Sequence, residues 1–226
     1  MITLLKKILP QSFRDRYRPT WYEIRLQSNI IWNRFIRLFL RPPLPNVGNG
    51  SIYLHLGCGP INHPMFINID ARPAPHIHYV RRIDNLSVFK NNTVDLIYAS
   101  HCLEHFSHRK IAEVLKEWYR VLKKGGVLRV SVPDFDLLLQ IYRNNRNDIN
   151  TIVLPLMGGQ DYRYNFHYAV FTTSSLSSLL RETGFTDIKS WEPGSMHLTT
   201  FDDWSAGKIT IHGRVYPVSL NIEAVK

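Results

Sequence analysis

The chain has little cysteine and no long hydrophobic run. Cys58 and Cys102 are its two cysteines, too few for a disulfide framework, and neither has metal-ligand spacing. No eighteen consecutive residues are apolar and uncharged, and charged residues and a proline break the apolar residues at positions 1–10. The sequence therefore predicts neither a transmembrane helix nor a signal peptide, and we expect a cytoplasmic protein, either free or peripheral to a membrane.

Acidic residues are scarce in the first part of the chain. The 226 residues carry a net charge of +10, and residues 1–45 hold nine Lys and Arg against two acids, so the remainder is nearly balanced. Prolines at positions 42, 43 and 45 mark a boundary. We expect a basic amphipathic extension over residues 1–47 and one globular domain over residues 48–226.

Residues 21–41 have the apolar spacing of an amphipathic helix. Its apolar side chains are Ile24, Ile31, Trp32, Phe35, Leu38 and Phe39, and arginines lie largely opposite them. Two interpretations remain open. The helix packs on the domain or on a second subunit of an oligomer, or it lies on anionic lipid.

A short apolar run over residues 52–56 ends at Gly57-Cys58-Gly59, and a second run over residues 66–69 ends at Asp70. The pattern is typical of a parallel strand whose sharp turn approaches a ligand, followed by a carboxylate that can accept two ribose hydroxyls. The third glycine of a dinucleotide fingerprint is missing, so we expect no phosphate at this turn.

The stretches LHLGCGP, INID and RRIDNLSVFKNNTVDLIYASHCLEH resemble the class I S-adenosylmethionine-dependent methyltransferases. The resemblance implies an α/β, Rossmann-like fold with a mostly parallel seven-stranded sheet, helices on both faces and a last strand antiparallel to the fifth. It also implies S-adenosylmethionine as cofactor, with Asp70 at the ribose and Asp84 at the adenine, although Asp84 also suits a turn. The implied cofactor residues are Gly57, Cys58, Gly59, Asp70, Asp84, Asn85, Ser100 and His101.

The remaining pattern alternates strands and helices, as expected for a sheet covered by helices. Predicted strands span residues 78–83, 94–99, 127–132, 185–191 and 219–225, and predicted helices span residues 107–121, 135–142 and 176–181. Two stretches, 148–170 and 192–216, are irregular. The first, rich in glycine and aromatic residues, is expected to form an active-site wall.

The LEH tripeptide, the stretch from GGQ to FH and the FDDW segment resemble small bacterial methyltransferases of glycan and natural-product pathways. The D/N-P-P-Y motif typical of nucleobase amine methylation is replaced by Ser100-His101-Cys102-Leu103. The expected acceptor is a small molecule or glycan with a reactive hydroxyl.

A hydroxyl acceptor requires a base, and histidine is the residue best suited to that role near neutral pH. We predict His167 as the base, oriented by Asp161, with His101 and His105 as the other candidate catalytic residues. No H-E-x-x-H signature accompanies these histidines, so no metal is predicted.

Two other functions remain as alternatives. The basic arm with Trp21, Tyr22, Trp32 and Phe35 could stack on single-stranded nucleic acid, although nucleic acid is not the expected partner. The chain could also be a scaffold that binds the cofactor without catalysis.

Overall fold

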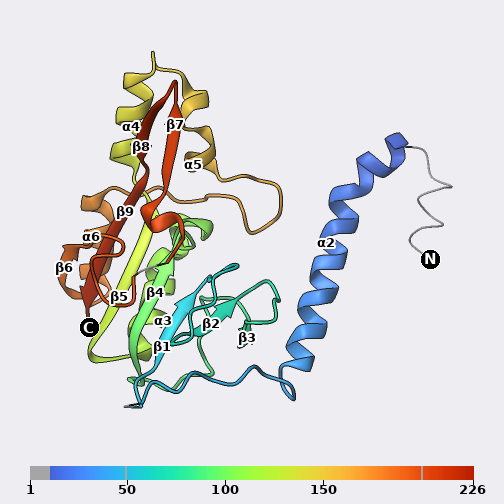
Figure 1. Ribbon diagram of the computed structural model, residues 1–226, viewed down its shortest axis with the longest axis vertical. Helices are drawn as coiled ribbons and strands as arrows, with labels where there is room; N and C mark the ends of the chain where they lie inside the picture. The colour runs from blue at the N-terminus through green and yellow to red at the C-terminus, as the bar shows by residue number, and fades with distance from the viewer. Residues whose placement is uncertain (1–10, 49, 200) are drawn as a thin grey trace.

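A seven-stranded sheet forms the centre of the computed structural model, which describes residues 11–48, 50–199 and 201–226, with side chains from residue 22 onward (Figure 1). Residues 1–10 of the expected N-terminal extension and the side chain of Trp21 lie outside this part. The strand order is β3-β2-β1-β4-β5-β9-β6. The strands are β1 (Tyr53–Leu56), β2 (Ile67–Asp70), β3 (Tyr79–Val80), β4 (Val94–Ser100), β5 (Leu122–Pro133), β6 (Thr186–Ser190) and β9 (Ser219–Val225).

Strands β1 to β5 run parallel, and β9 lies antiparallel between β5 and β6. The predicted Rossmann-like fold, the mostly parallel seven-stranded sheet and the antiparallel last strand are therefore confirmed, whereas the helices expected on both faces cover one face in the described part of the chain. Strand β3 is shorter than predicted, because its pairing with β2 ends at Asp70 and Val80. One further hydrogen bond, 2.8 Å from the Arg81 N–H to the Asp70 carbonyl, follows the last pair. The carboxyl ends of β1, β2 and β4 meet at one edge, where ligands bind in such sheets.

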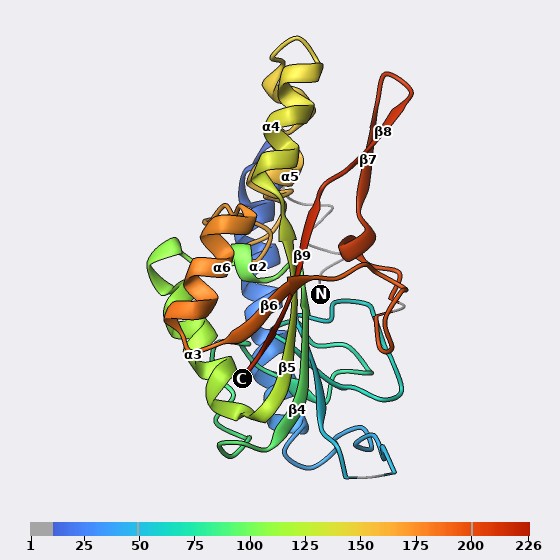
Figure 2. The same cartoon turned by 90° about the vertical axis from the view of Figure 1, so that its left-hand side faces the viewer.

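Helices α3 (Ile111–Val121) and α6 (Thr173–Glu182) cover one face of the sheet (Figure 2). The buried side chains of α3 recur at helical spacing and include Trp118, which is fully buried. A capping box between Thr172 and Ser175 begins α6, so the helix starts earlier than the predicted residue 176. The 3₁₀ turns are Leu103–His105, His108–Lys110, Ile149–Thr151 and Trp204–Ala206.

Aromatic side chains from loops cover part of the opposite face of the sheet. Tyr98 of β4 contacts Phe201 and Trp191, with ring centroids 4.4 and 5.9 Å apart. The prediction that residues 192–216 are irregular was wrong in part, because a hairpin of β7 (Lys208–Ile211) and β8 (Arg214–Pro217) lies there. Its turn residues, His212 and Gly213, both have positive φ, as a two-residue hairpin turn requires.

Helices α4 (Phe135–Asn144) and α5 (Val153–Met157) and the β7–β8 hairpin form a cap beyond the carboxyl ends of β4 and β5 (Figure 1). Leu138 and Ile141 of α4 pack with Ile152 and Val218, and side chains of the hairpin contact this small core. The cap places the hairpin and the segment after α5 above the edge where a ligand is expected.

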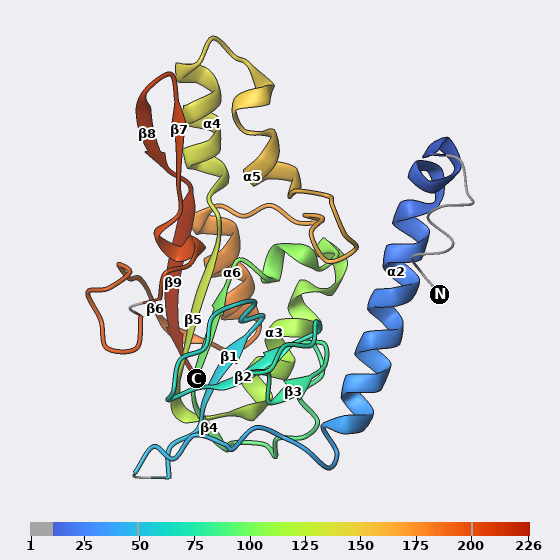
Figure 3. The same cartoon turned by 45° about the vertical axis from the view of Figure 1, so that its right-hand side comes forward.

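Helix α2 (Gln11–Ile36) lies beside the β3 edge of the sheet (Figure 3). Its buried residue Ile30 packs on Cys58, and Arg34 donates to the Val80 carbonyl at 2.9 Å. The predicted apolar stripe is not the packed side, since Trp32 and Phe35 are 62% and 56% exposed. The arginine side of the helix faces the sheet instead. Arg34 and Arg37 each donate a charge-assisted hydrogen bond to a backbone carbonyl at this edge.

In the described part of the chain, no helix is both long enough and apolar enough to cross a bilayer.

Candidate active site at the carboxyl ends of β1, β2 and β4

A cavity of about 520 Å³ lies at the carboxyl ends of β1 and β2. Gly57 and Gly59, which both have positive φ, form its floor. A side chain at Gly57 would be strained by its φ of +64° and would place its Cβ 2.8 Å from the Cβ of Cys102. The predicted turn therefore requires glycine at Gly57, and it leaves the backbone open to a ligand.

Asp70 lines this cavity and holds its turn in place. One carboxylate oxygen accepts the Gly59 N–H at 2.9 Å, and the other accepts the Arg72 N–H at 2.7 Å. The guanidinium of Arg72 lies 4.6 Å from the ring centre of Tyr162, which forms part of the opposite wall. Each carboxylate oxygen has a further lone pair, so Asp70 can still accept hydroxyl groups from a ligand.

Asp84, predicted at the adenine, and Asn85, predicted for the cofactor, do not line the cavity. The Asp84 carboxylate pairs with Arg82 at 2.6 Å, and the Asn85 side chain accepts from Arg81. Ile83, Arg82 and Phe106 line the cavity there instead.

A second cavity, of about 740 Å³, adjoins the first and shares Gly57, Gly59, His101, His105 and Tyr162 with it. Cys58 and Ser100, predicted for the cofactor, line this second cavity. Its outer wall comes from the cap and from the irregular stretch 148–170. The residues that face it there include Leu154, Gly158, Asn165, His167, Asp202, Trp204 and Ile209.

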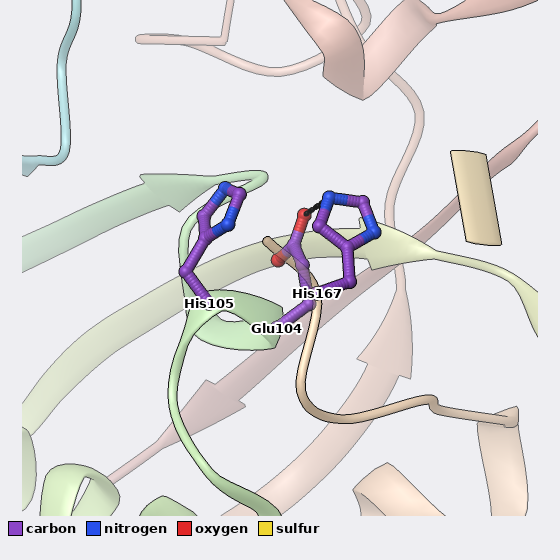
Figure 4. A group of neighbouring side chains, drawn as sticks. All are labelled: Glu104, His105 and His167. Atoms are coloured by element: carbon purple, nitrogen blue, oxygen red, sulfur yellow. Dashed lines mark ion pairs between the residues drawn. The ribbon is translucent and has the colours of Figure 1, made fainter. Parts of the chain in front are cut away.

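Glu104 lies where the two cavities meet and is fully buried, with 0% exposure. Its Oε1 is 3.3 Å from Nδ1 of His101. The same oxygen is 3.9 Å from Nε2 of His167 (Figure 4). Neither carboxylate oxygen has a hydrogen bond of good geometry among the described residues. Burial opposes ionisation of Glu104, but the interaction with His101, together with those of His105 and His167, outweighs it and lowers the pKa of this carboxyl.

The backbone brings the three histidines to Glu104. His101 follows β4 with a φ of +48°, a conformation that costs a non-glycine residue about 1 to 3 kcal/mol. His105 lies on the same 3₁₀ turn as Glu104. His167 comes from far along the chain, and the Tyr168 N–H next to it donates to the Glu104 carbonyl at 2.8 Å. This bond helps to hold the cluster and to offset the strain at His101.

Gly158 makes room for His167. A Cβ at Gly158 would lie 2.5 Å from the Asn165 carbonyl oxygen and 3.0 Å from the His167 ring, and its φ is +75°. The glycine pair in the GGQ stretch thus allows residues 165–167 to approach the cavity.

The prediction that Asp161 orients His167 was wrong. Asp161 accepts a hydrogen bond from Asn165, whereas Nδ1 of His167 donates to the Pro155 carbonyl at 3.0 Å. The carboxylate that faces His167 is Glu104, which was not among the predicted site residues. The signal was the LEH tripeptide, but only the fold shows that its glutamate points inward.

Comparison with known proteins agrees with this geometry. Residues 64–130 match a family model described as a methyltransferase domain. Among solved structures, similar chains include 1,6-didemethyltoxoflavin-N1-methyltransferase from Burkholderia thailandensis, bound to 1,6-didemethyltoxoflavin and S-adenosylhomocysteine (15% identity, 95% of this chain and 84% of that chain, TM-score 0.50). A SAM-dependent methyltransferase from Archaeoglobus fulgidus gives 17% identity over 95% of this chain and 98% of that chain, with a TM-score of 0.49. No curated protein matches the sequence.

The family match and the Rossmann-like fold identify the class of enzyme. The chain is a methyltransferase that uses S-adenosylmethionine as its cofactor. The first cavity fits this cofactor, because its volume is that of a small-molecule site, its glycine turn allows close approach and Asp70 offers acceptors for a ribose. When bound, the cofactor supplies an electrophilic methyl group on a sulfonium.

We predict that Asp70→Ala weakens S-adenosylmethionine binding at least tenfold. The change removes the acceptors for two ribose hydroxyls, each bond being worth about 1.5 to 3 kcal/mol, and it also releases the Gly59 N–H. Isothermal titration calorimetry measures the effect. Asp136→Ala, which removes an exposed carboxylate outside both cavities, is the matched control and should bind normally. A Kd for Asp70→Ala within about threefold of the wild type would contradict the ribose assignment.

Proposed function

We propose that the enzyme transfers the methyl group to a hydroxyl oxygen of a small or glycan-type acceptor bound in the second cavity. The observation that carries this proposal is the group of Glu104, His101, His105 and His167 where the two cavities meet. A hydroxyl must lose its proton to become a good nucleophile, and this cluster is the only part of the described cavity walls where partly buried imidazoles surround a buried carboxylate.

The second cavity has the chemistry of a site for a polyhydroxylated ligand. Trp204, half exposed, offers an aromatic surface, and Asp202 and Asn165 offer polar groups. Aromatic surfaces flanked by a few polar groups orient small ligands that are apolar on one side and polar on another. These side chains favour a sugar or similar hydroxyl-rich molecule.

In the same proposal, residues 48–226 form the methyltransferase domain and residues 1–47 its extension. Gly57, Cys58 and Gly59 hold the methionine part of the cofactor, and Asp70 holds the ribose. Asp84 and Asn85 reach the adenine only after Arg82 and Arg81 release them, whereas Ser100 and His101 lie toward the acceptor.

His167 is the member of the cluster proposed to remove the acceptor's proton. Its Nδ1–H is committed to the Pro155 carbonyl, so Nε2 carries the free lone pair. Burial lowers the pKa of His167, an effect that Glu104 opposes only in part, so the ring is neutral at pH 7 and able to accept a proton.

We predict that His167→Ala lowers kcat by about 10² to 10⁴ while S-adenosylmethionine affinity stays nearly unchanged. Turnover with saturating cofactor and a panel of hydroxyl-bearing acceptors, with methyl incorporation as readout, measures the effect. His108→Ala removes an exposed histidine outside both cavities and should be fully active. A loss of less than tenfold for His167→Ala, or a larger loss for His101→Ala, would move the role of base to another residue.

We also propose that the exposed side of α2 lies on an anionic membrane surface. Trp32 and Phe35 lie on this side and Phe39 just after the helix, with stacked or edge-on rings, and Arg25 of the helix is exposed. An apolar stripe beside basic residues is typical of helices that bind at a lipid interface.

The triple variant Trp32→Ser, Phe35→Ser and Phe39→Ser is expected to lose at least tenfold in co-sedimentation with phosphatidylserine-containing vesicles. It should keep cofactor binding, since these rings face away from the sheet whereas Ile30 stays packed. Val215→Ser, an exposed apolar change on the hairpin, is the control. Equal sedimentation of the triple variant would refute the membrane proposal, and salt-sensitive binding to random oligonucleotides instead would support the nucleic-acid alternative.

A further inference from the structure

The side chains of Glu104, His101, His105 and His167 present more hydrogen-bond acceptors than donors to one another. His105 faces the Phe166 carbonyl through Nδ1 at 3.0 Å, and His167 faces the Pro155 carbonyl through Nδ1 at 3.0 Å. A carbonyl oxygen only accepts, so both Nδ1 atoms carry the hydrogen. In the neutral rings, Nε2 of His105 and Nε2 of His167 therefore hold lone pairs.

His101 also turns a lone pair toward Glu104, but through Nδ1 and not through Nε2. Its Nε2 lies 2.8 Å from the Ser219 hydroxyl, which itself donates to the Trp204 carbonyl. The hydroxyl hydrogen is thus already used, so Nε2 of His101 must be the donor in that contact. Nδ1 of His101, 3.3 Å from Glu104 Oε1, is left with its lone pair toward a carboxylate.

A buried carboxylate facing neutral imidazole lone pairs is unfavourable unless a positive charge lies among them. In the described part of the chain, no lysine or arginine forms an ion pair or a hydrogen bond with Glu104. The missing charge must come from protons on the histidines or from a bound cation.

We propose that Glu104, His105 and His167 bind a divalent transition-metal ion. One ligand atom from each of the three lies within 4.8 Å of the others (Figure 4). Around an ion about 2.1 Å from each ligand, tetrahedral ligand atoms lie about 3.4 Å apart, so Glu104 Oε1 and His167 Nε2, 3.9 Å apart, need to approach by about 0.5 Å. The third ligand, whose atom lies within 4.8 Å of the other two, needs a movement of up to about 1.4 Å.

The surroundings of the three ligands match those of known metal sites. Histidine ligands usually donate their other N–H to a backbone carbonyl, which fixes the tautomer and the ring orientation. His105 and His167 both do so. Two imidazoles and one carboxylate select ions such as Zn²⁺, Co²⁺ or Mn²⁺ over Ca²⁺, and three ligands leave coordination positions open toward the second cavity.

The consequence for the reaction rests on the proposed function. An ion in this position binds the acceptor hydroxyl and lowers its pKa, so that the proton passes to solvent as the oxygen forms its bond to the methyl carbon and the carbon–sulfur bond breaks. In that arrangement His167 is a ligand and not the base. The sequence predicted no metal because it lacks a local signature, and the donor set assembles only when His167 folds back onto Glu104.

The test uses Co²⁺ as the probe, because its visible absorption reports the ligand geometry. The full chain, purified without a histidine tag and treated with EDTA, is titrated with CoCl₂ and with ZnCl₂, and bound metal is counted by mass spectrometry after gel filtration. We expect about one equivalent, with a Co²⁺ spectrum of a four- or five-coordinate site. His167→Ala and His105→Ala should each weaken binding at least tenfold, whereas His108→Ala should bind as the wild type does.

Several results would overturn the proposal. One is less than one tenth of an equivalent of metal on the wild type, and another is equal binding by His167→Ala and His108→Ala. Because Glu104 is buried, the Glu104→Gln variant is tested for metal binding only after circular dichroism shows that it has folded. If the metal-free enzyme methylates a hydroxyl acceptor as fast as the loaded enzyme, the metal proposal fails and the proposed function stands. If the ion binds as described and only nitrogen acceptors are methylated, the hydroxyl proposal fails instead.

Discussion

The structure around the active site depends on one buried carboxylate. Glu104 is fully buried where two cavities meet, and it can remain ionised there only if positive charge or hydrogen-bond donors surround it. Its backbone carbonyl accepts the Tyr168 N–H, so the same residue that gathers the histidines also anchors the segment that delivers His167. The position of residues 158–169 and the polarity of the site therefore have a common cause.

The sheet explains why the cluster lies beside the cofactor. Strands β1 and β4 are neighbours and parallel, so the Gly57 turn after β1 and the strained His101 after β4 leave the sheet at the same edge. Gly57 has no side chain, and Cys102 fills the space that a side chain would take. The two cavities thus share a boundary at which, in the proposed function, a methyl group can pass directly from the cofactor to the acceptor.

The alternation of strands and helices, the turn at Gly57 and the carboxylate at Asp70 follow from local sequence signals, but the group of side chains around Glu104 does not. The order of the strands was expected only from the resemblance to methyltransferases, and Asp84 and Asn85, expected at the cofactor, do not line the first cavity. The Glu104–His167 contact joins residues 63 positions apart, and no periodicity reports it. Which side of α2 packs on the sheet was left open by the sequence, because the bonds from Arg34 and Arg37 to edge carbonyls join residues far apart in the chain. The β7–β8 hairpin was not predicted, because its turn, His212-Gly213, is not among the common hairpin sequences.

The most direct test of this account is a crystal structure of the full chain with S-adenosylhomocysteine. We expect the ribose hydroxyls within about 3 Å of the Asp70 carboxylate, and the sulfur directed toward the boundary formed by His101, Glu104 and His105. A ligand bound elsewhere, or a sulfur directed away from Glu104 and the second cavity, would contradict the account.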